Sequence, residues 1–282
     1  MKNIVLNNGV EMPVIGLGVY QVPDQQECEQ TVYDAIISGY RLIDTAAAYM
    51  NEEAVGRAVK RSGVPREELF ITTKLWIQDS GYYNAKRAFE KSLKKLQLDY
   101  LDLYLIHQPF GDIYGSWKAM EELYKEGKIR AIGVSNFYPD RLMDLMVHNE
   151  IIPAVNQIET HPYWQQYEAQ EFMKEHGIHL QAWSQFAQDN EIFSNPLLSA
   201  VAVKYNKSVA QLILRWLTQR GISVIPKSVR KERILENINI SDFEISDEDM
   251  ETIKKLDTGK TTIFDHHDPA MVKFLGEFRF DI

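Results

Sequence analysis

The feature that most constrains the fold is an eightfold alternation of short apolar runs with longer amphipathic stretches. Each apolar run has four to seven residues, is bounded by Gly, Pro or a charged residue, and contains β-branched or aromatic residues, a pattern typical of strands buried on both faces. The predicted strands are residues 14–18, 41–44, 69–74, 101–107, 129–135, 154–159, 179–184 and 223–227. The predicted helices are residues 25–38, 52–61, 84–96, 117–126, 141–148, 166–176, 208–218 and 231–238.

Strands that alternate with helices at this spacing indicate βα units and a parallel sheet, and eight such units favour a closed (β/α)8 TIM barrel of the α/β class. A doubly wound open sheet is the competitor. The first strand-to-helix turn, GLGVYQ at residues 16–21, lacks the third glycine of a dinucleotide fingerprint. We therefore expect one barrel domain over residues 1–282, with a hairpin at 4–12 and an irregular tail at 257–282.

Composition narrows the class of partner. The net charge of −9 argues against a phosphate backbone or an anionic membrane as the main partner. The chain has one cysteine, no signal-peptide pattern and no apolar window long enough to span a bilayer. We expect a cytoplasmic monomer that binds a small molecule and neither nucleic acid nor membrane.

Polar residues end several of the predicted strands. In a barrel the carboxyl ends of the strands converge on one face, so Asp44, Lys74 and His107 become neighbours, and Tyr49 follows Asp44 by five residues. Taken singly, Asp44 could cap a helix and His107 could be a core histidine, whereas a lysine that ends a buried strand needs a carboxylate. Together the four supply a carboxylate, an ammonium, a phenol and an imidazole.

Such a set suits carbonyl reduction. An ammonium at Lys74, held by Asp44, is expected to lower the pKa of the Tyr49 phenol from about 10. Tyr49 would then donate a proton to the developing alkoxide while His107 orients the carbonyl. The hydride must come from a bound carrier, because no side chain supplies one.

The chain resembles the aldo-keto reductase family over essentially its whole length, and most closely its bacterial branch that includes diketogluconate reductases. The matching segments are MPVIGLG at 12–18, GYRLIDTA at 39–46, YMNE at 49–52, TKLW at 73–76, LDLYLIH at 101–107, GVSNF at 133–137 and IPKS at 225–228. The resemblance implies a barrel whose N-terminal hairpin plugs the base, NADPH as cofactor without a Rossmann motif, no metal, and a tetrad of Asp44, Tyr49, Lys74 and His107.

The resemblance also implies the cofactor contacts. Ser135, Asn136 and Gln157 would hydrogen-bond the carboxamide, and Trp183 would stack on the nicotinamide where relatives commonly have tyrosine. Lys227, Ser228 and Arg233 would contact the 2′-phosphate of NADPH. Glu236 and Asn237 would contact its adenine. Further expected contacts are Gly18, Val19, Tyr20, Ser184 and Val229. Independently of the resemblance, four cationic residues lie within residues 226–233, at the start of a predicted helix. This placement favours a bound anion.

The substrate pocket is expected to be walled by Tyr20, Trp76, Phe110 and His107. Two departures from the family pattern affect it. Gln108 stands where relatives usually have tryptophan, which makes the pocket more polar beside the reacting carbonyl. The loop that starts at Ser184-Gln185-Phe186 lacks, through residue 190, the glycines common there. The sequence therefore indicates a carbonyl substrate without saying which one.

Three other functions remain open. A short-chain dehydrogenase would use the Tyr-x-x-x-Lys pattern of Tyr82 and Lys86, although no glycine-rich nucleotide turn accompanies it. A metal-dependent hydrolase would draw on Glu159 and His161 or on residues 266–268 (His-His-Asp), which we expect to form a solvated polar tail. A non-catalytic or very slow NADPH-binding barrel of the same family is the third.

Overall fold

The computed structural model describes residues 2–188 and 190–282. Eight strands form one sheet in chain order, and every neighbouring pair is parallel. An isolated parallel bridge from Ile15 to Val224 joins the two ends of the sheet and closes the ring. The strands are β3 (Gly16–Gly18), β4 (Leu42–Asp44), β5 (Phe70–Leu75), β6 (Leu101–Ile106), β7 (Ile129–Ser135), β8 (Val155–Glu159), β9 (His179–Trp183) and β10 (Ser223–Val224). The predicted barrel and all eight of its strands are confirmed.

The predicted N-terminal hairpin is also confirmed. Strands β1 (Asn3–Val5) and β2 (Glu11–Pro13) pair antiparallel around a turn in which Gly9 has φ +83°, a conformation that favours glycine. Leu6 and Met12 pack with apolar residues of the barrel strands in one buried cluster. The hairpin therefore plugs one end of the barrel and leaves the other end for a site.

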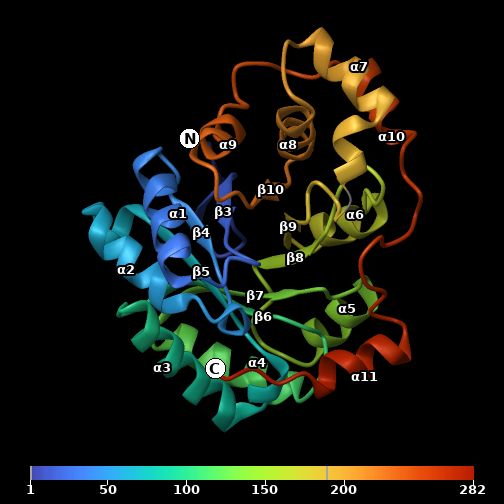
Figure 1. Ribbon diagram of the computed structural model, residues 1–282. Coiled ribbons are helices and arrows are strands. Elements are labelled where there is room, and N and C mark those ends of the chain that lie inside the picture. The colour runs from blue at the N-terminus through green and yellow to red at the C-terminus, as the bar shows by residue number, and fades with distance from the viewer. Residues whose placement is uncertain (1, 189) are drawn as a thin grey trace.

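Helices surround the sheet (Figure 1). Eight of them match the predicted helices within a few residues: α1 (Gln25–Ile37), α2 (Glu52–Ser62), α3 (Tyr82–Leu96), α4 (Ile113–Lys125), α5 (Pro139–Val147), α6 (Tyr167–Glu175), α8 (Val209–Gln219) and α9 (Lys231–Ile238). Three were not predicted: α7 (Pro196–Lys204), α10 (Asp247–Lys254) and α11 (Pro269–Glu277). Each of the three has a capping side chain, from Asn195, Ser246 and Asp268, so their start signals were present in the sequence.

The C-terminal tail folds back over the barrel, and its end lies near α3 and α4 (Figure 1). Gln78 exchanges two hydrogen bonds with the backbone of Phe280, at 2.9 and 3.1 Å. Lys91 contacts the terminal residue, Ile282. The expectation of a solvated polar tail is wrong for His266, which is 8% exposed and bonded to Gln108. Among the described residues, no helix combines the length and apolar character needed to cross a membrane.

Candidate active site

The four predicted catalytic residues meet at the carboxyl ends of β4, β5 and β6. Lys74 donates hydrogen bonds to Asp44 Oδ1, to the carbonyl of Thr45 at 2.9 Å and to Tyr49 Oη at 3.4 Å. The rings of Tyr49 and His107 stand edge to face with centroids 5.6 Å apart. Four side chains spread over 64 positions of sequence thus form one cluster.

Tyr49 is held by a short 3-10 turn, η1 (Ala47–Tyr49), that follows β4. The turn ends at Met50 in a left-handed conformation, φ +55°. The buried amide of Asn51 then donates to the backbone carbonyls of Val19 and Val22 at 3.0 and 3.2 Å. These bonds fix the turn against the loop after β3, so the phenol has a defined position.

The ion pair of Lys74 and Asp44 is buried, with the two residues 0% and 1% exposed. Burial lowers the pKa of Lys74 and raises the pKa of Asp44, and the attraction between the two charges opposes both shifts. Gln157 adds a second donor to the carboxylate, with its Nε2 atom 2.8 Å from Asp44 Oδ2. Asp44 is therefore satisfied as a carboxylate by a cation and an amide.

The pKa of Tyr49 differs from the expectation. Burial raises it well above its ordinary value, and the nearby Asp44 carboxylate raises it further. The prediction that this pKa is lowered is therefore wrong for the structure described, because burial and the neighbouring Asp44 and Tyr20 all raise it. At neutral pH the phenol keeps its proton, which is the state that a proton donor needs.

His107 is neutral at neutral pH. Burial lowers the pKa of its imidazole well below the ordinary value, and the positive charge of Lys74 lowers it further. A neutral imidazole has one N–H donor and one acceptor nitrogen. Its buried Nδ1 atom has no hydrogen-bond partner among residues 2–188 and 190–282. The ring can therefore donate a hydrogen bond to a carbonyl without carrying a charge.

The three residues expected at the carboxamide and Trp183, expected on the nicotinamide ring, lie together beside the tetrad. Trp183 Nε1 donates to Asn136 Oδ1 at 2.9 Å, and Ser135 Oγ donates to the carbonyl of Gln157 at 2.7 Å. Asn136 adopts the left-handed conformation, φ +66°, and its Nδ2 atom donates to the carbonyl of His107 at 3.0 Å. A polar shelf next to an indole ring fits a nicotinamide with its carboxamide. The sequence did not reveal that Gln157 also supports Asp44.

The residues expected at the phosphate lie where α9 begins. The helix N-cap, Arg230, makes no side-chain capping bond, so N–H groups of the first turn remain for an anion. Lys231 pairs with Asp34 at 3.5 Å, whereas Lys227, Arg230 and Arg233 form no ion pair with the described residues. Three unpaired cations at an uncapped helix start fit the 2′-phosphate of NADPH.

The remaining expected cofactor residues differ in what they can offer. Gly18 lies so close to the residue after β10 that a Cβ atom there would be 2.7 Å from the carbonyl oxygen of Ile225. Val19 is fully buried in the main core, so only its backbone could reach a ligand. Tyr20 and Val229 are exposed, and Asn237 is buried. Ser184 and Glu236 are half-buried. Asp189, in the loop that departs from the family pattern, lies outside the described residues.

Aromatic rings wall the space above the tetrad. Tyr20 lies 5.1 Å from Tyr49 between ring centroids, and Trp76 lies 5.1 Å from His107. The predicted pocket residues Tyr20 and Trp76 are therefore beside the tetrad. Sequence reasoning missed the tail residues: Phe280 packs edge to face on Trp76 at 5.3 Å, and the carbonyl of Phe278 accepts from the Trp76 indole at 3.3 Å.

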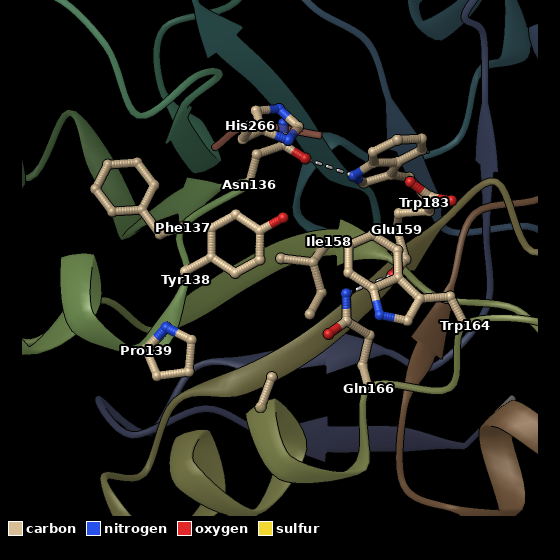
Figure 2. Close-up of a pocket in the computed structure, with 11 residues that line it drawn as sticks. Asn136, Phe137, Tyr138, Pro139, Ile158, Glu159, Trp164, Gln166, Trp183 and His266 are labelled. Carbon is tan, nitrogen blue, oxygen red and sulfur yellow. Dashed lines mark hydrogen bonds between the residues drawn. The ribbon is translucent and has the colours of Figure 1, made fainter. Parts of the chain in front are cut away.

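A small hollow that is open to solvent lies beside this cluster. It is lined by eleven residues from β8 and β9, the segments after β7 and β8, the beginnings of α5 and α6, and the tail, and it contains no member of the tetrad. Asn136, Trp183 and His266 are among its walls (Figure 2). The hollow therefore shares Asn136 and Trp183 with the expected nicotinamide site, and the candidate active site is located by the tetrad itself.

The residues of the rival functions have structural partners. Glu159 accepts from His161 at 2.9 Å and from the side chains of Thr261 and Thr262 at 2.7 and 3.2 Å, which anchors the tail. Within the described residues, no group of three His, Cys, Asp or Glu side chains could hold a metal ion. Tyr82 and Lys86 both bond Glu122 on the outer helices, away from the tetrad.

Comparisons with known proteins agree with this geometry. The model of the aldo/keto reductase family matches residues 14–258. A glyoxal reductase of Bacillus subtilis (strain 168) is 55% identical over 254 residues, which are 90% of this chain and 92% of that protein.

Two solved structures have the same fold. MGS-M4, an aldo-keto reductase from a Medee basin deep-sea metagenome library, has a TM-score of 0.92 at 44% identity, covering 94% of this chain and 98% of its own. An aldo-keto reductase of Bombyx mori in complex with NADP has a TM-score of 0.89 at 36% identity, covering 96% of each chain. This chain belongs to the aldo/keto reductase family and is an oxidoreductase that acts on carbonyl groups.

Proposed function

We propose that this protein reduces small aldehydes or ketones to alcohols with NADPH, that Tyr49 donates the proton, and that glyoxal-like compounds are the first substrates to try. The observation that carries the proposal is the buried cluster in which Lys74 contacts both Asp44 and Tyr49. The relative named for glyoxal reduction supports the choice of substrate.

Each member of the tetrad has a distinct task in this reaction. Tyr49 Oη gives its proton to the carbonyl oxygen as the carbonyl carbon receives the hydride, and the phenolate regains a proton from solvent. The neutral His107 donates a hydrogen bond to the same oxygen and orients it. Lys74 stabilises the phenolate that forms, and Asp44 holds Lys74 in place. No covalent intermediate on the protein is required.

The cofactor contributes the one group that the chain lacks. When bound, NADPH supplies the hydride. Ser135, Asn136 and Gln157 hold the carboxamide and Trp183 covers the nicotinamide ring. Lys227, Ser228 and Arg233 bind the 2′-phosphate, Glu236 and Asn237 contact the adenine, and Gly18, Val19, Tyr20, Ser184 and Val229 complete the site.

A substrate panel tests the reaction. Purified protein with NADPH and glyoxal, methylglyoxal, benzaldehyde or a diketone should consume NADPH, measured by its absorbance, faster than a protein-free blank. NADPH binding by calorimetry without consumption for any member of the panel would instead favour the non-catalytic barrel. Absence of both binding and consumption would reject the family's activity for this chain.

The Arg233→Ala variant tests the phosphate site. We expect the Kd for NADPH to rise about 10- to 100-fold, because a charge-assisted contact is lost, while the Kd for NADH stays nearly constant. Isothermal titration of both cofactors measures the ratio. Lys231→Ala is the matched control, because Lys231 pairs with Asp34 in the structure. An unchanged NADPH-to-NADH ratio in Arg233→Ala rejects this assignment.

We further propose that residues 1–282 form one domain that works as a cytoplasmic monomer and binds neither nucleic acid nor membrane. The acidic charge of −9 supports the absence of nucleic-acid and membrane partners, since the cations at the start of α9 are local and suited to one dinucleotide. The single closed sheet supports one domain.

A further inference from the structure

Gln108 links the tetrad to the C-terminal tail. It directly follows His107 and is 5% exposed. Its Oε1 atom lies 2.9 Å from Nε2 of His266 and 3.3 Å from Nδ2 of Asn136. The His266 ring also stacks on Phe110, with centroids 6.0 Å apart. A polar side chain therefore stands beside the catalytic imidazole and is held from the tail.

The orientation of the Gln108 amide follows from its neighbours. An indole N–H can only donate, so the Asn136 atom that faces Trp183 at 2.9 Å must be its oxygen (Figure 2). The nitrogen of Asn136 therefore faces Gln108, and the Gln108 atom that it meets must be the acceptor oxygen. That oxygen can only accept, so Nε2 of His266, which lies 2.9 Å away, must carry the proton of the ring. Burial lowers the pKa of His266 to about 4, so the ring carries this one proton and no charge.

The nitrogen of the Gln108 amide has no partner among the described residues. The Gln108 Nε2 atom makes no hydrogen bond with the described residues, and it is not among the polar atoms sealed from solvent. Its two N–H groups are left for a ligand. A simple aldehyde offers one oxygen, which Tyr49 and His107 already address. A further donor on the residue that follows His107 would suit a substrate that carries a second acceptor oxygen.

We propose that Gln108 is a specificity residue whose Nε2 group donates a hydrogen bond to an oxygen on the carbon next to the reacting carbonyl. The substrate class that it selects is then 1,2-dicarbonyl and 2-hydroxycarbonyl compounds. His266 acts as a positioning residue that fixes the amide from the tail. The inference rests on the proposed carbonyl reduction and assigns the substrate preference of that same site.

Methylglyoxal and propanal provide a matched pair of substrates, because both have three carbons and only methylglyoxal has the second oxygen. We expect Gln108→Leu to lower the ratio of their kcat/KM values by about tenfold relative to the unmodified protein, the effect of one lost hydrogen bond. Hydration of the aldehydes in water affects both proteins equally and cancels in this comparison. Gln26→Leu, the same change on the exposed side of α1, should leave the ratio constant.

His266→Phe tests the positioning role, since it keeps an aromatic ring against Phe110 and removes the N–H donor. The ratio of kcat/KM for methylglyoxal to that for propanal should fall, mostly through a higher KM for methylglyoxal. In the double variant Gln108→Leu/His266→Phe, this ratio should be no lower than in Gln108→Leu alone. A further fall in the double variant would overturn the positioning role. If the leucine variant does not fold, Gln108→Met gives an apolar side chain of similar length.

The failures of the two proposals are distinguishable. If Gln108→Leu leaves the ratio of the two kcat/KM values unchanged, the role of Gln108 is overturned while carbonyl reduction stands. An equal loss of kcat/KM for methylglyoxal and propanal is one such outcome. If the unmodified protein consumes NADPH with neither substrate nor with the wider panel, the proposed function itself fails.

Discussion

Tyr49→Phe is expected to lower the rate of carbonyl reduction by about 10²- to 10⁴-fold, the range typical of losing a general acid. Burial keeps the Tyr49 phenol protonated at neutral pH, so the wild-type side chain holds the proton that the alkoxide takes. Phenylalanine keeps a ring beside Tyr20 and over the Lys74 ammonium, which lies 4.9 Å from the ring centroid. The change therefore removes one hydroxyl and little packing.

Single-turnover measurements with bound NADPH give the rate of the chemical step without cofactor release. The Kd for NADPH should stay within about twofold, because the phenol is not among the proposed cofactor contacts. Tyr83→Phe is the control, since Tyr83 is 78% exposed and loses the same hydroxyl. Near-normal single-turnover rates in Tyr49→Phe would show that another group donates the proton.

Lys74→Met should reduce the free energy of unfolding by about 3–5 kcal/mol at neutral pH, because it leaves the buried Asp44 carboxylate without its cation. In this variant the pKa of Asp44 in the folded state exceeds that in the unfolded state, because burial raises it with no ammonium to oppose the shift. The folded state then binds more protons, so stability falls as pH rises and part of the loss is recovered in acid.

Urea denaturation across neutral to mildly acid pH measures this loss. The Lys74→Met/Asp44→Asn variant removes both charges and should be more stable than Lys74→Met alone, with a weaker dependence on pH. Lys254→Met is the control, since Lys254 forms an exposed ion pair with Glu251 at 3.5 Å. A Lys74→Met protein as stable as the wild type would contradict the view that this buried charge depends on its partner.

The eight strands could be predicted because each is buried on both faces and appears in sequence as a short apolar run. Helices with periodic apolar faces were predictable for the same reason. The helices α7, α10 and α11 were missed although Asn195, Ser246 and Asp268 cap them. They lie outside the repeating βα units, where the alternation of strands and helices does not predict a helix. Their capping residues were the one signal in the sequence that indicated them.

The sequence also placed the tetrad, because barrel geometry brings strand ends together wherever they fall in the chain. It could not give the direction of the pKa shift at Tyr49. That direction depends on how completely the phenol loses water and on the carboxylate beside it, and both are consequences of packing. The bond from Gln157 to Asp44 likewise joins residues 113 positions apart.

The sequence by itself determined the closed parallel barrel, its N-terminal hairpin and the identity of the four polar residues at or near the strand ends, since local periodicity, the turn residues and strand polarity encode these. Only the tertiary structure decided how the tail completes the site. The contact of Gln108 with His266 spans 158 positions. Its amide is oriented by Asn136, which follows β7, and by Trp183 at the end of β9. No local pattern encodes this arrangement, which forms only when the ring has closed.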